Sequence, residues 1–252
     1  MIVDLYTGYD KRELLIALAE NGHILRNIVI PKDDKYLDEL QDFLRYLSDT
    51  DLEVIDFDKQ GREHLDGEDC RGVLLLSAGF PRILSPTHYR LYDYAINIHP
   101  TLLPRHRGKY QNYVILDGDS QSGLTAHLID EGVDTGPILK SVQFDLSPFE
   151  TIRSLKRRSI ELEPAFVVDV LSDLEDLVRT AMSQDERQAT THLNQRVPGD
   201  SELDPSLPLI DLLPIIRAAD PDLYPAHFWH NGKRIRVTTC RDDKPREEWD
   251  MV

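Results

Sequence analysis

Residues 71–80 read RGVLLLSAGF and indicate the fold class. The run from Gly72 to Ala78 is almost entirely apolar, carries no charge and has the length of one strand. Strands of a parallel sheet read this way because helices cover both faces of the sheet. We therefore predict that residues 72–78 form a central strand of an α/β sheet.

The segments on either side repeat a strand–helix pattern. Strand-like runs are expected at 1–6, 24–31, 52–57, 94–100, 122–130 and 137–146. Helical apolar spacing is expected at 10–23, where Gly22 is a plausible stop, at 35–49, and at 149–178 with a break or kink near Pro164. Alternating strands and helices predict right-handed βαβ units and a Rossmann-like, mostly parallel sheet. The first β–α turn has neither a GxGxxG motif nor a P-loop, so nothing there indicates a dinucleotide.

A second, smaller unit is expected after the core. We place the catalytic core at residues 1–182 and a small C-terminal α+β subdomain at 183–252. It is predicted to hold a short helix at 209–220 and a β-hairpin at 226–241 that turns at Asn231–Gly232. Phe228, Trp229 and Ile235 are candidates for its buried face.

Composition restricts the function classes. With 29 basic and 45 acidic residues the formal net charge is −16, which argues against a nucleic acid as the main partner. A small anion held by a few local cations remains compatible with this charge. The two cysteines fit a reduced, cytoplasmic setting. The N-terminus does not read as a signal peptide, and no apolar run has the length of a membrane span. No His, Cys, Asp and Glu cluster has metal-ligand spacing, so no metal is expected.

The stretch AINIHPTLLPRHRG, residues 95–108, holds the candidate chemistry. Asn97 and His99 lie two residues apart at the end of a predicted strand, so both side chains point into one crevice beyond the sheet. Asp134 follows in a loop between Gly132 and Gly136. A carboxylate beside an imidazole raises the pKa of the histidine and orients it, and an amide can stabilise an oxyanion. The set suits acyl transfer to an amine; a structural histidine and a turn-forming aspartate are the alternative.

Three ordered motifs then carry a resemblance to a known family. AGFPRILSP, INIHPTLLPRHRG and HLIDEGVDTGPIL resemble the N10-formyltetrahydrofolate-dependent formyltransferases, most strongly from residue 72 to 160. The resemblance implies a formyltransferase core with Asn97, His99 and Asp134 as the catalytic set. His99 would take the amine proton or stabilise the oxyanion, Asn97 would donate to that oxyanion, and Asp134 would orient His99 and relay protons.

The resemblance also implies where the co-substrate N10-formyltetrahydrofolate binds. The pterin is expected between two loops whose backbone groups read its edge. Its binding residues would be Phe80, Pro81, Arg82, Ile83 and Leu84 in the first loop, and Ile129, Asp130 and Gly132 in the second. Pro81 removes one backbone N–H from the first loop.

The segment after the core narrows the choice of acceptor. It resembles the sugar and methionyl-tRNA branches of the family in a pattern formed by Arg196, Pro198, Asp200, Ile216, Arg217, Ala218, Pro225 and Phe228. Glycinamide ribonucleotide formyltransferases typically stop after the core, and formyltetrahydrofolate hydrolases carry an N-terminal regulatory domain. A methionyl-tRNA enzyme would need a larger C-terminal barrel than about 60 residues provide, and a charge of −16 would repel tRNA.

We therefore predict a sugar N-formyltransferase that acts in glycan or O-antigen biosynthesis and forms a homodimer. Its acceptor would be a nucleotide-linked amino-deoxysugar, with Arg105, Arg107, Lys109, Tyr110 and Asn112 as candidate substrate-binding residues. An ordinary solvated basic loop is the alternative for the cations. Two other functions stay open. One is formylation of another amine, such as glycinamide ribonucleotide or a carrier-bound aminoacyl group, and the other is a folate-binding regulator without turnover.

Overall fold

A seven-stranded mixed sheet forms the centre of the computed structural model, which describes residues 1–8, 10–31, 53–60, 65, 69–109, 111–194 and 196–252. The predicted helix at 35–49 and the candidate residue Tyr110 lie outside the described residues. The strands are β1 (Ile2–Tyr6), β2 (Ile24–Ile30), β3 (Glu53–Asp56), β4 (Val73–Ala78), β5 (Tyr94–His99), β6 (Arg107–Gly108), β7 (Gln121–Leu128), β8 (Ile138–Asp145), β9 (Thr191–His192), β10 (His227–His230) and β11 (Lys233–Arg236). The helices are α1 (Arg12–Glu20), α3 (Phe57–Gln60), α4 (Pro86–Tyr89), α5 (Asn112–Leu116), α6 (Ile152–Ser172), α7 (Leu174–Arg179) and α8 (Leu209–Ala218), with short 3₁₀ turns η2 (Pro198–Ser201) and η3 (Arg246–Glu248).

The sheet order is β3-β2-β1-β4-β5-β7-β8. The strands from β3 to β5 are parallel, and β7 and β8 add antiparallel pairs at one side. This confirms the predicted α/β class with a mostly parallel sheet. The central strand β4 is buried at every position, as its apolar run predicts.

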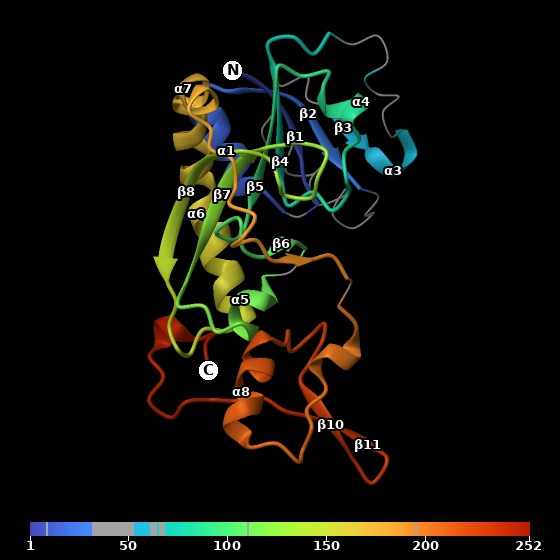
Figure 1. Ribbon diagram of the computed structural model, residues 1–252, viewed down its shortest axis with the longest axis vertical. Helices are drawn as coiled ribbons and strands as arrows, with labels where there is room; N and C mark the ends of the chain where they lie inside the picture. The colour runs from blue at the N-terminus through green and yellow to red at the C-terminus, as the bar shows by residue number, and fades with distance from the viewer. Residues whose placement is uncertain (9, 32–52, 61–64, 66–68, 110, 195) are drawn as a thin grey trace.

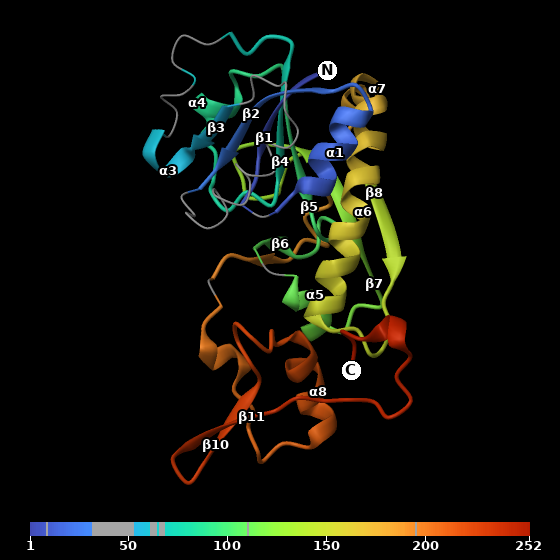
Figure 2. The same ribbon diagram turned by 180° about the vertical axis from the view of Figure 1, so that it is seen from behind.

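Side chains of β4 alternate between two cores. Leu74 and Leu76 pack in the core that includes residues of α1, α6 and α7, whereas Val73 and Leu75 pack on the other face near Tyr89 of α4. The helices α1 and α6 lie side by side on one face of the sheet (Figures 1 and 2). Burial on both faces explains why β4 lacks the polar alternation of a half-exposed strand.

The long helix α6 differs from its prediction at Pro164. It runs unbroken from Ile152 to Ser172 with Pro164 inside it, and the interruption falls at Asp173, before α7. Proline removes one helical N–H, the partner of the Ile160 carbonyl. Ile160 is exposed, so this turn of the helix faces solvent. A break near Pro164 is therefore wrong, and the kink expected there as the alternative stays a prediction.

The C-terminal elements form their own small cluster. Leu203, Leu212, Ile216, Ala219 and Ala226 pack together, and Phe228 contacts them. The hairpin β10–β11 turns at Asn231–Gly232, both with positive φ (48° and 71°), which confirms the predicted turn. Figures 1 and 2 place this unit at the end of the molecule away from the N-terminus. The core boundary at residue 182 stays a prediction.

The predicted buried face of the hairpin is only partly present. Phe228 is half-buried against the small cluster, whereas Trp229 and Ile235 are exposed in the described chain. The two-residue turn sets which side chains share a face, but it does not say which face the rest of the chain covers. The expectation for Trp229 and Ile235 was therefore wrong for the single chain.

Candidate active site

Three neighbouring strands bring polar side chains together around the end of β5. Asn97 and His99 come from β5, Ser77 lies opposite Asn97 on β4, and His127 lies opposite Asn97 on β7. The loop between β7 and β8 brings Asp134 to both Asn97 and His99. The structure thus brings together the three residues predicted as a catalytic set.

Hydrogen bonds define which way the Asn97 amide points. Its Oδ1 accepts from the Ser77 hydroxyl (2.7 Å), and its Nδ2 lies 3.1 Å from His127 Nε2 and 3.2 Å from Asp134 Oδ1. A hydroxyl can donate to the amide oxygen while the two acceptors take the amide protons. The amide protons of Asn97 therefore point toward Asp134, on the side where His99 lies.

His127 is a site residue that the sequence analysis did not assign. Its Nδ1 lies 2.8 Å from the carbonyl of Leu128, so Nδ1 carries the proton and Nε2 is free to accept from Asn97. His127 Nε2 is also 3.5 Å from Asp134 Oδ1. It stands in the quoted motif HLIDEGVDTGPIL, but only the pairing of β7 with β5 shows that it faces Asn97.

His99 is buried, with both ring nitrogens in defined surroundings. Its Nε2 lies 2.9 Å from the backbone carbonyl of His106, which can only accept, so Nε2 carries a proton. Its Nδ1 lies 3.4 Å from Asp134 Oδ2. Nδ1 is therefore the atom that can exchange a proton, and Asp134 stands where it stabilises the imidazolium that results.

Burial and charge act against each other on the pKa of His99. Burial in the protein lowers the pKa of His99 below its usual value, and the attraction of Asp134 only partly opposes this. The sequence analysis expected the carboxylate to raise the pKa of this histidine. Asp134 acts in the expected direction, but the net pKa is lowered because the cost of burying an imidazolium exceeds the gain from one carboxylate.

Asp134 is held as a carboxylate in a rare backbone conformation. Burial acts to raise its pKa, but His99, His127 and the backbone N–H of Gly108 together lower it to about 2. The N–H of Gly108 donates to Oδ2 at 2.8 Å. Asp134 has a φ of 54°, in the left-handed region that few non-glycine residues occupy. Such conformations concentrate at functional sites, where the surrounding structure enforces them.

The two loops predicted to hold the pterin meet at one apolar cluster. Phe80 and Ile129 both pack against the core that contains Leu84. Ile83 is 76% exposed, so the first loop presents an apolar side chain to solvent. Asp130 accepts from the backbone of Gly132 and from the Thr135 hydroxyl, which closes the second loop on itself.

The two remaining residues of the first loop differ in their contacts. Arg82 forms a two-pronged ion pair with Asp58 and is otherwise exposed. Pro81 lies against Gly8, since a Cβ at Gly8 would meet the proline ring at 2.7 Å. Their roles toward a pterin stay predictions.

Two of the cations predicted to hold an acceptor form ion pairs within the protein. Arg107 is buried and pairs with Glu186 through two hydrogen bonds (2.7 and 2.9 Å), and Arg105 pairs with Asp119 at 2.7 Å. The backbone of Lys109 donates to the carbonyl of His192. For Arg105 and Arg107, the proposed binding of a diphosphate therefore requires these ion pairs to be exchanged.

Asn112 has a structural contact. Its side-chain amide is buried and donates to the carbonyl of Ala218 at 2.5 Å, which joins α5 to the end of α8. This contact accounts for the burial of the amide, and a role toward the acceptor stays a prediction.

Among the described residues, one group of side chains has the spacing of metal ligands. His106 and Asp117 are close in sequence and His192 lies far along the chain, and each offers a ligand atom within 4.8 Å of the others. The sequence analysis expected no metal because it considered ligand spacing along the chain.

The catalytic set can transfer one proton and stabilise one developing negative charge, through the side chains of Asn97, His99 and Asp134. His99 Nδ1 is the proton-exchanging atom, Asp134 stabilises its charged form, and the amide of Asn97 can donate to an oxyanion when it exchanges one of its two present acceptors. None of the three has to act as a nucleophile. This arrangement suits group transfer at a carbonyl carbon.

Comparison with known proteins agrees with this class. Residues 65–171, which include all three side chains, match the family described as formyl transferase. The methionyl-tRNA formyltransferase of Ehrlichia ruminantium (strain Gardel) is 36% identical over 144 residues. The match covers 56% of this chain but only 45% of that relative, so it spans less than half of the relative's length.

Solved structures resemble the chain over a longer stretch. A sugar N-formyltransferase from Shewanella sp FDAARGOS_354 has a TM-score of 0.76 at 19% identity and covers 97% of this chain and 100% of its own. An N-formyltransferase from Helicobacter canadensis, solved with folinic acid and dTDP-3-aminofucose, has a TM-score of 0.68 at 17% identity and covers 93% and 85%. At these identities the likeness shows the fold.

Within the described part of the chain, no helix has both the length and the apolar character that crossing a membrane requires.

Proposed function

We propose that the protein transfers a formyl group from N10-formyltetrahydrofolate to the amine of a nucleotide-linked amino-deoxysugar. The observation that carries the proposal is the convergence of Asn97, His99 and Asp134 at the end of β5, inside the segment that matches the formyl transferase family. The family supports the formyl chemistry, and the folate bound in the Helicobacter canadensis protein supports the donor.

The site's residues suggest the following order of proton movements. The amine nitrogen bonds to the formyl carbon, and the carbonyl electrons move to oxygen, where the Asn97 amide donates a hydrogen bond. His99 Nδ1 takes the proton that the amine loses, and Asp134 stabilises the imidazolium. The bond from the formyl carbon to N10 then breaks, and N10 receives the proton from His99. The formylated amine leaves with no covalent enzyme intermediate.

Two observations support a sugar nucleotide as the acceptor. The Shewanella sugar N-formyltransferase covers 97% of this chain, so the likeness extends through the C-terminal unit as well as the core. The net charge of −16 disfavours a long polyanion, whereas a diphosphate needs only a few donors. Arg105, Arg107 and Lys109, which follow β5 along the chain, are the proposed donors.

Methionyl-tRNA is the second candidate acceptor. The 36% identity to a methionyl-tRNA formyltransferase favours it, although the shared segment is the one that holds the catalytic set. A homodimer and a role in glycan biosynthesis belong to the sugar proposal.

An acceptor panel tests the proposal. The full chain is incubated with N10-formyltetrahydrofolate and, separately, with nucleotide-linked amino sugars, glycinamide ribonucleotide, a carrier-bound aminoacyl group and methionyl-tRNA. Products are analysed by mass for the gain of one formyl group. We expect formylation of at least one amino sugar, with the other acceptors unchanged. Formylation of methionyl-tRNA alone would contradict the sugar proposal and leave the formyl chemistry standing.

A further inference from the structure

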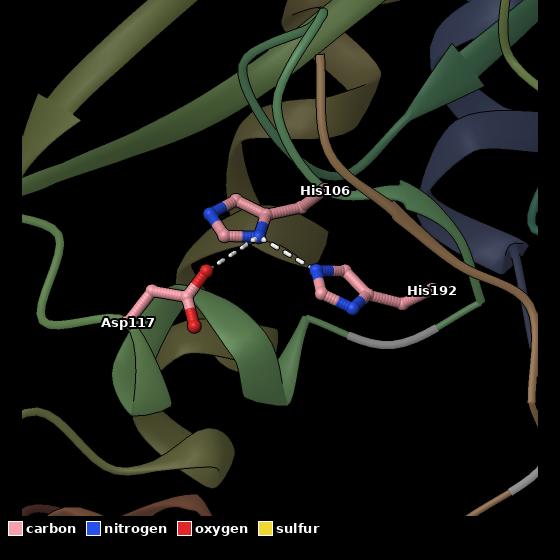
Figure 3. Close-up of side chains that lie close together, drawn as sticks. All are labelled: His106, Asp117 and His192. Carbon is pink, nitrogen blue, oxygen red and sulfur yellow. Dashed lines mark hydrogen bonds and ion pairs between the residues drawn. The ribbon is translucent and has the colours of Figure 1, made fainter. Parts of the chain in front are cut away.

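We propose that His106, Asp117 and His192 form a binding site for a divalent transition metal, with Zn²⁺ the best match for the ligand set. Two imidazoles and one carboxylate are the ligands that zinc takes at sites with an open fourth position. Figure 3 shows the three side chains converging from separate segments, with His106 in the middle. This site does not depend on the proposed formyl transfer.

The distances between the ligand atoms suit one small ion. His106 Nδ1 lies 3.4 Å from His192 Nε2 and 3.8 Å from Asp117 Oδ2. Ligands about 2.1 Å from a tetrahedral zinc stand about 3.4 Å apart. The atoms of His192 and Asp117 lie within 4.8 Å of each other, so this third pair must approach by up to about 1.4 Å to share one ion.

A second carboxylate gives His106 the form that a metal requires. His106 Nε2 lies 2.6 Å from Asp119 Oδ2, and this contact holds the ring proton on Nε2. The lone pair of Nδ1 then points toward His192 and Asp117. Histidine ligands commonly donate their other ring N–H to a carboxylate in this way, which fixes their orientation.

The second imidazole is also held before any metal arrives. The ring of His192 stacks on Tyr113 with centroids 3.5 Å apart and planes within 5°. The pairing of β6 with β9 fixes the backbone on both sides, and the N–H of His106 donates to the Thr190 hydroxyl. His106 has a φ of 58°, another rare non-glycine conformation that points to a constrained position.

Charge and access favour a cation here. The two carboxylates, Asp117 and Asp119, face one guanidinium, Arg105, which lies 2.7 Å from Asp119 and 3.8 Å from Asp117. With neutral imidazoles this local group keeps one net negative charge. His106 is buried, but the side chain of Asp117 is 37% exposed, which gives an ion a way in.

A bound metal would stabilise the segment beside the candidate active site. His106 offers its carbonyl to His99, and Gly108 offers its N–H to Asp134. His192 belongs to β9, which runs toward the C-terminal unit. An ion held by these residues would thus fix β6 against β9 and hold both contacts in place.

Metal titration of the untagged full chain, stripped with a chelator and dialysed, tests the site. Zn²⁺ is titrated in competition with a chromophoric chelator, and Co²⁺ is added separately to record its visible absorption. We expect one Zn²⁺ per chain, a tetrahedral Co²⁺ spectrum and a rise in Tm with Zn²⁺. His192→Ala and Asp117→Asn should each weaken Zn²⁺ at least tenfold, and Asp119→Asn 10- to 100-fold.

His230→Ala provides the matched control, since His230 is an exposed histidine on the β10–β11 hairpin. It should keep the wild-type affinity and stoichiometry. Asp117→Asn changes an exposed side chain, so it keeps the test valid if His192→Ala fails to fold. The proposal is overturned if the wild-type chain binds no Zn²⁺, or if Asp117→Asn and His230→Ala bind it equally well.

Discussion

His99 is buried, and one of its ring nitrogens, Nδ1, can exchange a proton. The chemistry proposed for this site therefore depends on the protonation state of His99. Burial keeps the ring neutral at pH values where an exposed histidine would begin to charge. Asp134 acts in the opposite direction and keeps the charged form within reach. A base of this kind is ready to accept a proton at neutral pH.

The pH dependence of kcat/KM should follow from these directions. His99 acts as a base in its neutral form, and its pKa is lowered, so activity should hold down to about pH 6.5 and fall only below it. Asp134→Asn removes the group that raises the pKa of His99. The fall of the remaining kcat/KM on the acid side should therefore shift to lower pH. A limb that stays in place or moves upward in this variant would contradict the assignment.

Folding stability should have its own acid dependence. The pKa of Asp134 is lowered to about 2, so its contribution to stability is present above its unfolded value near 4 and is lost as pH falls toward 2. The lowered pKa of His99 adds a loss as pH falls below about 6.5, because the unfolded chain then binds the proton more readily.

Ser77 should affect catalysis only through Asn97. Ser77→Ala removes the donor to Asn97 Oδ1 and frees the amide to rotate, so kcat should fall about tenfold, as loss of a hydrogen bond of about 1.4 kcal/mol would give. The KM for the folate donor should change little. Ser77→Thr keeps a hydroxyl and should restore part of kcat, whereas a variant Ser77→Ala with full kcat would show that Asn97 needs no orientation.

At the scale of elements, the short strand β6 links the site to the rest of the chain. Gly108 has a φ of 102°, and a Cβ there would meet the carbonyl oxygen of His192 at 2.3 Å. The close approach of β6 to β9 therefore requires a glycine.

Gly108→Ala should push β9 away and weaken the N–H contact to Asp134. We expect kcat/KM to fall at least tenfold, measured with the acceptor that the panel identifies. Gly118→Ala is the matched control, because Gly118 has a similarly strained φ of 72° but nothing within 4 Å of a new Cβ. Equal losses in the two variants would show that strain alone, and not the contact with His192, is responsible.

A buried ion pair joins the two helices on one face of the sheet. Lys11, which precedes α1, lies 2.5 Å from Glu163 of α6, and both side chains are below 10% exposed. Lys11→Met leaves a buried carboxylate without its partner and should lower the free energy of unfolding by about 3–5 kcal/mol. Lys11→Met with Glu163→Gln should recover most of this, as measured by denaturant unfolding. A single variant as stable as the wild type would contradict the burial of this pair.

Local sequence patterns predicted most of the helices and strands, because neighbouring residues determine them. The apolar run of β4 and the Asn231–Gly232 turn are set by neighbouring residues, and both appear as expected. The helix α6 continues through Pro164, where a break or kink was expected, because a proline inside a helix removes only one of its hydrogen bonds. Asn97 and His99 lie two residues apart on one strand, so the two-residue repeat of a strand is enough to predict that their side chains share a face. His127 and Ser77 lie beside them only because of the order of the strands in the sheet, which local sequence patterns do not predict.

At the scale of the whole molecule, the C-terminal unit is tied to the core by specific contacts. Asn112 of α5 binds the end of α8, and Arg217 of α8 donates to the carbonyl of Glu150. Arg157 of α6 forms a two-pronged pair with the buried carboxylate of Asp250. These contacts connect the end of the described chain to the elements around the proposed acceptor side.

The most direct test of the account compares folate binding with formyl transfer in the same proteins. Wild-type chain, Asn97→Ala and His99→Ala are each titrated with N10-formyltetrahydrofolate and then assayed for formyl transfer to the nucleotide-linked amino sugars. The account predicts near wild-type donor binding in both variants, with transfer reduced about 10²-fold or more. Variants that bind the donor and transfer formyl at the wild-type rate would contradict the claim that this site performs the chemistry.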